Sequence, residues 1–114
     1  MTDIEKLYHA KSYDENVMKL CEEAGELIQA VVKDCLNQTP QNRQNVIEEL
    51  VDVEICMKIL FLELEITDAE LTDMRHWKME RNLQRVQESC DIANYIEDCE
   101  DCGRCGAGEP DGQD

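Results

Sequence analysis

The sequence lacks several features that define common protein classes. No apolar run approaches the roughly 18 residues that a membrane span needs, so we expect no transmembrane segment and no membrane partner. The N-terminus is polar from residue 2 onward, so we expect no signal peptide. Basic side chains are few: 11 Lys and Arg stand against 27 Asp and Glu, for a formal net charge of −16. Because nucleic acids are bound through Lys and Arg, we expect no nucleic-acid partner either.

Helix-breaking residues are nearly absent from the first 90 residues. The whole chain has two prolines and five glycines, and four of those glycines follow residue 102. No stretch alternates apolar and polar residues for long enough to indicate a strand. A disordered acidic chain would be poor in aliphatic residues, whereas 42% of this chain is hydrophobic. At 114 residues, the chain is predicted to form one all-α domain, a bundle of about four helices.

Capping signals divide the helical region into four segments. Each begins with a Ser or Thr that can serve as N-cap, followed in three cases by a Glu that completes a capping box and in one case by a proline. These signals are Thr2 with Glu5, Ser12 with Glu15, Thr39 with Pro40, and Thr67 with Glu70. The helices that they predict span about 3–11, 13–36, 40–65 and 68–90.

Residues 91–114 differ in composition from the helical domain, which we place at residues 1–90. The segment is acidic and rich in glycine, so we expect it to be a largely disordered tail with one helical turn near 92–96. It contains Cys99, Cys102 and Cys105, whose spacing leaves two interpretations: a Zn²⁺ site, or oxidation-prone thiols in a mobile tail.

The number of cysteines indicates whether the protein works in an oxidising or a reducing cellular compartment. The chain has seven, an odd number, and we expect no export signal. A disulfide framework is therefore disfavoured, and we predict a cytoplasmic protein.

The helix predicted over 40–65 is apolar on two nearly opposite sides. One stripe contains Val46, Leu50, Val53, Met57, Leu60 and Leu64, and the other contains Val51, Ile55, Ile59 and Leu62. Such a helix is buried between layers, in a bundle or in a subunit interface. Because one short chain cannot cover both stripes, we predict a homodimer or a homotetramer.

Carboxylates are concentrated in the second and third predicted helices. Glu22, Glu23 and Glu26 lie on the second helix, and Glu49 and Asp52 lie between the apolar stripes of the third. Spacings of three or four residues place side chains on one helical face, and two antiparallel helices could bring the two sets together. Such carboxylates repel one another unless a hard cation binds, so we predict Mg²⁺, with Mn²⁺ as the alternative. Such a site suits hydrolysis at phosphorus by a metal-bound water; the alternative is a solvated acidic face.

These two motifs resemble those of the all-α nucleoside triphosphate pyrophosphohydrolases of the MazG type. The resemblance covers about residues 15–88 and rests on Glu22-Glu23-Ala24-Gly25-Glu26 and Glu49-Leu50-Val51-Asp52. It implies Mg²⁺-dependent hydrolysis of a nucleoside triphosphate to a monophosphate and pyrophosphate. The metal ligands that it implies are Glu23, Glu26, Glu49 and Asp52. Glu22 would support the metal site, or would be the catalytic base that orients the attacking water.

The fourth predicted helix is locally basic. Lys78, Asn82 and Arg85 share one stripe, at spacings of four and three residues. The family carries a similar K-x-x-x-N pattern that touches the phosphate tail, and Lys78 and Asn82 match it. We therefore predict that Lys78, Asn82 and Arg85 bind the substrate. The alternative is a solvated basic face that balances neighbouring acids.

Two other functions stay open. The phosphoribosyl-ATP pyrophosphohydrolase of histidine synthesis has a similar helical core, but its second motif continues as D-L-x-Y-H, whereas this chain continues as Asp52-Val53-Glu54-Ile55-Cys56. A non-catalytic acidic helical protein that acts as a binding partner would spread its carboxylates over the surface. A ferritin-like di-iron site is disfavoured because His9 and His76 lack the E-x-x-H pairing.

Overall fold

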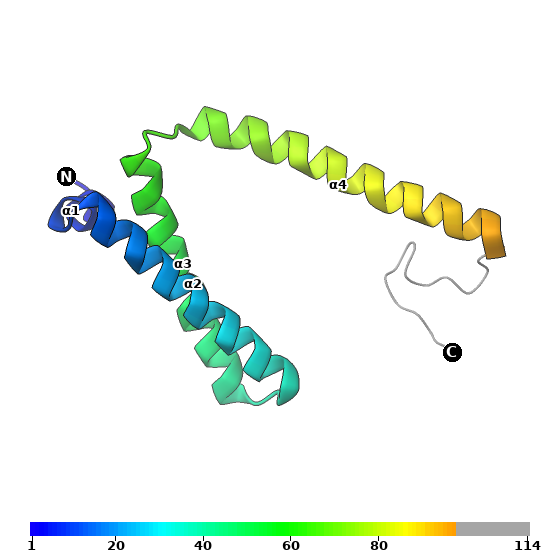
Figure 1. The fold of residues 1–114 in the computed structure, drawn as a ribbon, viewed down its shortest axis with the longest axis horizontal. Helices are drawn as coiled ribbons and strands as arrows, with labels where there is room; N and C mark the ends of the chain where they lie inside the picture. Colours follow the sequence, from blue (N-terminus) through cyan, green and yellow to red (C-terminus); the bar gives the residue numbers. More distant parts are fainter. Residues whose placement is uncertain (98–114) are drawn as a thin grey trace. The chain divides into compact units, whose positions relative to one another are not determined.

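The computed structural model describes residues 1–97, with side chains up to residue 90, and contains four helices and no strand within that range. The helices are α1 (Asp3–Ala10), α2 (Tyr13–Leu36), α3 (Pro40–Glu63) and α4 (Asp68–Glu97) (Figure 1). The all-α prediction is therefore confirmed. The chain divides into one unit at Met1–Thr67 and a second that begins at Asp68, and each unit is described by itself.

Side-chain caps define where the helices of the first unit begin. Thr2 and Ser12 are the N-caps of α1 and α2, and each forms a capping box with the Glu three residues later. Thr39 caps α3, since its Oγ1 accepts a hydrogen bond from the backbone N–H of Asn42 at 3.0 Å. These contacts satisfy backbone N–H groups that the helix itself leaves without partners. The three predicted caps are confirmed.

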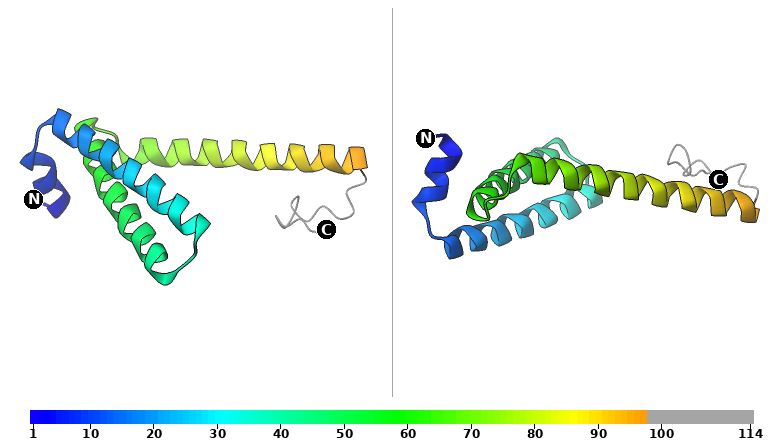
Figure 2. Two further views of the ribbon diagram at one scale, coloured as in Figure 1. Left: turned by 60° about the horizontal axis from the view of Figure 1, so that its bottom comes forward. Right: turned by 90° about the horizontal axis from the view of Figure 1, so that it is seen from above.

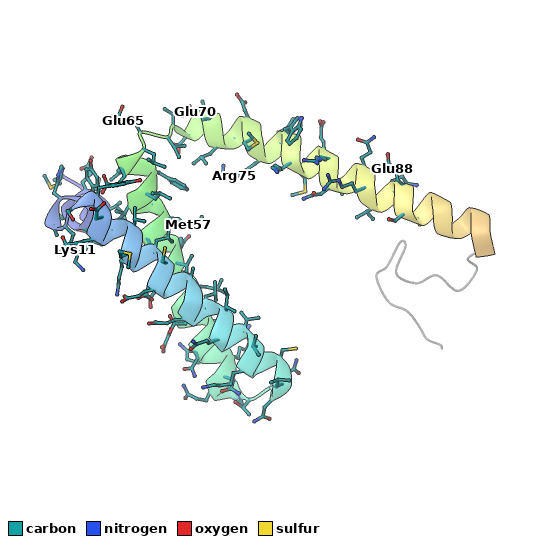
Figure 3. The ribbon with its side chains drawn as sticks, in the orientation of Figure 1. Lys11, Met57, Glu65, Glu70, Arg75 and Glu88 are labelled. Carbon is teal, nitrogen blue, oxygen red and sulfur yellow. The ribbon has the colours of Figure 1, made fainter. Side chains whose placement is uncertain are left out.

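A hydrogen-bonded turn ends α3 at Glu63, slightly before the predicted end. The backbone N–H of Ile66 donates to Phe61 O at 2.9 Å, and that of Glu65 donates to Leu62 O at 3.2 Å. Glu65, at the turn labelled in Figure 3, has a φ of 55°. This is the left-handed region that glycine usually occupies after a helix, so Glu65 adopts it at an energetic cost.

The helices α2 and α3 pack along each other as a hairpin, and α1 also contacts α3 (Figures 1 and 2). Asn16 connects all three helices. Its Nδ2 donates to Glu63 Oε2 on α3 at 3.0 Å and, more weakly, to Tyr8 O on α1 at 3.4 Å. Asn16 is buried, so these bonds specify how the three helices meet.

The apolar core of the first unit is small. Cys56 and Ile59 of α3 are the buried apolar residues of the described part of the chain. Leu50, Val51 and Met57 remain exposed, so each apolar stripe of α3 keeps uncovered members within a single chain. The predicted oligomer would cover them, and it stays a prediction.

The helix α4 begins at Asp68, as predicted, but continues past the predicted end near residue 90 to Glu97. The turn expected at 92–96 is thus helical, as part of α4, and the proposed domain boundary at residue 90 falls inside this helix. Residues 98–114, with Cys99, Cys102 and Cys105, lie outside the described residues. The described cysteines are all free. Over the same part of the chain, no helix has the length and apolar character to span a bilayer.

Candidate metal centre

Three carboxylates from α2 and α3 converge at one point of the helical hairpin. One oxygen each of Glu23, Glu49 and Asp52 lies within 4.8 Å of the other two. Glu23 belongs to α2, whereas Glu49 and Asp52 lie about one turn apart on α3. The structure therefore brings residues of the two acidic motifs together across the pair of helices.

Glu23 is the buried member of this cluster, with a side chain only 6% exposed. Its Oε2 lies 2.8 Å from Lys19 Nζ, one turn earlier on α2. This contact with Lys19 lowers the pKa of the Glu23 carboxyl, so the group is ionised at neutral pH. Its other oxygen, Oε1, is buried and has no hydrogen-bond partner in the described part of the chain. An ionised oxygen in that position is costly unless a ligand satisfies it.

Glu49 is affected by the same crowding of charge. Its Oε1 is also buried without a hydrogen-bond partner among the residues described. Burial raises the pKa of Glu49, and the charges of Glu26, Asp52 and Glu23 raise it further. Proton binding at Glu49 relieves this repulsion in part, and a divalent cation would relieve it more fully.

Glu26 is the fourth predicted ligand, and it lies at the edge of the cluster. It interacts with both Glu23 and Glu49, because it affects the pKa of each. Glu26 and Glu49 also line a hollow of about 360 Å³ between α2 and α3. The other residues that line this hollow are Gln29, Ala30, Lys33, Asn42 and Asn45. Three of the four predicted ligands therefore converge to within 4.8 Å, and the fourth, Glu26, lines a hollow together with Glu49.

Glu22 occupies a different position from the other acidic residues of its motif. It is exposed and lines a second hollow, of about 300 Å³, at the start of α2. The other residues of that hollow are Lys11, Asp14, Glu15, Met18 and Lys19. Glu22 therefore lies outside the group of three converging carboxylates, and its role in orienting water stays a prediction.

Two further residues bear on the cluster: Lys19 contacts Glu23, and Cys56 lies one turn after Asp52 on α3. Lys19 is not among the residues predicted for the site, although its spacing of four residues from Glu23 is the usual signal for an ion pair on a helix. Cys56 is buried one turn after Asp52, and burial, followed by the negative charge of Glu23, raises the pKa of its thiol. The Cys56 thiol is therefore protonated at neutral pH in the metal-free chain.

The predicted substrate-binding residues Lys78, Asn82 and Arg85 lie on α4, in the second unit, and all three are exposed. Figure 3 shows side chains projecting from α4 around its axis, Arg75 and Glu88 among them. Trp77 lies beside two cations, with Lys78 Nζ 5.6 Å and Arg81 Cζ 5.2 Å from its ring centroid. Since each unit is described by itself, phosphate binding by α4 stays a prediction.

The sequence matches no protein-family model and no curated protein, and the fold matches no solved structure. The functional assignment therefore depends on the residues themselves: the two acidic motifs and the place where their side chains meet.

Proposed function

We propose that this chain is a Mg²⁺-dependent nucleoside triphosphate pyrophosphohydrolase. The observation that supports this most strongly is Glu23 Oε1, an ionised and buried oxygen without a hydrogen-bond partner in the described chain, next to Glu49 and Asp52. Lys19 satisfies only the other oxygen of Glu23. A carboxylate that merely improves solubility would be exposed to water on both oxygens, so this arrangement favours a bound cation over a solvated acidic face.

The donor atoms fit Mg²⁺ or Mn²⁺. Every predicted ligand is a carboxylate oxygen, which hard divalent cations prefer, and the nearby Cys56 is a neutral thiol. Four carboxylates gather here, and the Lys19 ammonium group pairs with one of them, Glu23. A polyphosphate would be repelled from this site unless a cation first offset that charge.

The proposed reaction assigns a role to each group of residues. A bound Mg²⁺ supplies charge neutralisation for the phosphates and an acidic water. Glu23, Glu26, Glu49 and Asp52 would hold the cation, and Glu22 would orient the water that attacks the α-phosphorus and accept its proton. The bond from that phosphorus to the bridging oxygen breaks, which gives a nucleoside monophosphate and pyrophosphate.

Two further residue sets complete the proposal. Lys78, Asn82 and Arg85 of α4 bind the leaving phosphates. The exposed apolar residues of α3 pack against a second copy in a homodimer or a homotetramer. Sedimentation of the full chain tests this assembly, and a stable monomer would contradict it.

A pyrophosphate-release assay tests the activity. The full chain is supplied with Mg²⁺ and a panel of canonical and modified ribo- and deoxyribonucleoside triphosphates, together with phosphoribosyl-ATP. We expect pyrophosphate from at least one triphosphate, and none after chelation of the metal. Cleavage of phosphoribosyl-ATP alone would favour the histidine-synthesis enzyme instead.

A matched pair of variants links that activity to the site. Glu49→Gln removes one of the three converging carboxylates, whereas Glu48→Gln makes the same change of charge at an exposed neighbour. We expect Glu49→Gln to abolish turnover and Glu48→Gln to retain it. An absence of turnover on every nucleotide, with no metal-dependent rise in melting temperature, would overturn the proposal.

A further inference from the structure

The carboxylate of Glu23 has its two oxygens in different environments. Oε2 lies 2.8 Å from Lys19 Nζ, whereas Oε1 is buried and has no hydrogen-bond partner among the described residues. The side chain is only 6% exposed, so water reaches it poorly. Of the two oxygens, Oε1 is therefore the one that is left for a cation to satisfy.

Lys19 and Glu23 form their ion pair within α2. The two residues lie four apart on this helix, a spacing that brings side chains together on one face. The Lys19 side chain is about half exposed, so its ammonium group keeps part of its hydration and pairs at little desolvation cost. Since α3 contributes no atom to this contact, the pair does not require the carboxylates of α3.

A carboxylate can bind a cation through one oxygen or through both. A cation that binds both oxygens of Glu23 would share Oε2 with the Lys19 ammonium group, and two positive charges on one oxygen repel each other. Ca²⁺ accepts more oxygens than Mg²⁺ and can take both from one carboxylate, whereas Mg²⁺ keeps several waters in a small octahedral shell. Restriction of Glu23 to one oxygen therefore disfavours Ca²⁺ more than Mg²⁺.

We infer that Lys19 is a positioning residue that restricts Glu23 to one metal-binding oxygen and so gives the site a preference for Mg²⁺ over Ca²⁺. This inference rests on the proposed function, since it takes Glu23 as a ligand of the cation. Carboxylate oxygens bind both of these hard cations, so the residue types at Glu23, Glu49 and Asp52 do not by themselves select Mg²⁺. Lys19 acts through Glu23 and does not touch the cation.

Nuclear magnetic resonance measures the two affinities at this site. The metal-free full chain, labelled with ¹⁵N, is titrated with MgCl₂ and, separately, with CaCl₂, and the backbone amide signal of Glu23 is followed. This signal reports on the site itself, although the chain has 27 acidic side chains that could attract cations elsewhere. We expect the unsubstituted chain to bind Mg²⁺ more tightly than Ca²⁺, and tighter binding of Ca²⁺ would overturn the inference.

Three variants test the role of Lys19. Lys19→Met leaves Oε2 open, so we expect the affinity for Ca²⁺ relative to that for Mg²⁺ to rise by about tenfold, as one more oxygen becomes available. Lys19→Arg keeps a positive charge beside Oε2 and should preserve the ratio of the unsubstituted chain. Lys11→Met is the matched control, because Lys11 (labelled in Figure 3) lines the same hollow as Lys19, but it is Lys19 that pairs with Glu23.

A measurement on the unsubstituted chain keeps the test independent of how well the variants fold. The side-chain ammonium signal of Lys19 is followed as Mg²⁺ is added, and that of the exposed Lys11 is the reference for a solvated lysine. We expect Lys19 to stay paired with Glu23 when Mg²⁺ binds. Movement of the Lys19 signal to the position of the Lys11 signal would overturn the inference, because both oxygens of Glu23 would then be open to the cation.

The outcomes separate this inference from the proposed function. If the chain releases pyrophosphate but Lys19→Met leaves the ratio of affinities unchanged, or Lys11→Met or Lys19→Arg raises it equally, Lys19 does not set the preference and the activity stands. If no nucleotide is hydrolysed but Lys19→Met alone raises the ratio, the role of Lys19 stands and the proposed activity falls.

Discussion

Replacing Glu49 by Gln should raise the melting temperature of the metal-free chain and remove most of its response to Mg²⁺. Burial and the neighbouring carboxylates raise the pKa of Glu49 in the folded chain. The folded state therefore holds this proton more tightly than the unfolded state does. The resulting stabilisation is present below the unfolded pKa and is lost as pH rises through the folded pKa. At neutral pH the ionised carboxylate is unfavourable, and Gln removes the charge while keeping the shape.

The metal response has a magnitude that can be estimated. A cation that binds only the folded chain stabilises it by about 2.7 kcal/mol when present at a hundred times its dissociation constant. For a unit of the size of Met1–Thr67, each kcal/mol moves the melting temperature by about 4–8 °C. The unsubstituted chain should therefore gain about 10–20 °C from Mg²⁺. If losing one of three converging oxygens weakens binding a hundredfold, the same Mg²⁺ stabilises the variant by only about 0.4 kcal/mol.

Circular dichroism melts at neutral pH measure both effects. Each protein is first freed of metal with a chelator and is then melted with and without Mg²⁺. The exposed neighbour Glu48 provides the control, because Glu48→Gln makes the same change of net charge outside the cluster. Two results would refute the reasoning: no Mg²⁺-dependent shift in the unsubstituted chain, or an equal loss of that shift in Glu48→Gln and Glu49→Gln.

Three further substitutions test the supporting contacts. Lys19→Met should destabilise the metal-free chain at neutral pH, because Lys19 lowers the pKa of Glu23 in the folded chain. The stabilisation that results from this lowered pKa is present above the unfolded pKa of Glu23 and is lost as the pH falls through the folded pKa. The melting temperature of the variant should therefore depend less on pH in the acid range than that of the unsubstituted chain. Glu65→Gly should stabilise the fold by about 1 kcal/mol in urea unfolding, because Glu65 has a φ of 55°; a loss of stability would contradict this. Asn16→Ala should cost about 1–3 kcal/mol in the same assay, since Glu63 loses its hydrogen bond, and an unchanged midpoint would show that Asn16 does not connect the helices.

The helix starts were predictable because capping is local. Thr2, Ser12 and Thr39 each bond to backbone N–H groups within the next three residues, so sequence and structure carry the same signal. The helix ends were less predictable. Glu65, just after α3, adopts the left-handed conformation that glycine usually occupies at the end of a helix, so no glycine in the sequence marked this end. For α4, the acidic composition after residue 90 predicted an end near that residue, whereas the helix continues to Glu97. Residues 68–102 contain no proline or glycine that would end a helix near residue 90.

The candidate site was predictable in part. Helical periodicity placed Glu49, Asp52 and Cys56 on one edge of α3; in the structure Glu49 and Asp52 converge with Glu23, and Cys56 is buried. On α2, Glu23 and Glu26 were already distinguished from Glu22 as the metal ligands, but the sequence did not identify that Glu23 would be buried and Glu26 exposed. These two residues differ by about 60° around the helix, so the rotation of α2 against α3 decides between them.

The sequence by itself determined that the chain forms helices, where they begin, and that two acidic motifs lie on α2 and α3. Those properties depend on neighbours a few residues apart, which the chain order specifies. Only the tertiary structure decided that Glu23 is buried against Lys19 with one oxygen unsatisfied, that Glu22 lies elsewhere, and that Asn42 and Asn45 line a hollow next to Glu49. These features depend on the packing of two helices whose contacting residues lie far apart in the chain, and burial arises only when the helices meet.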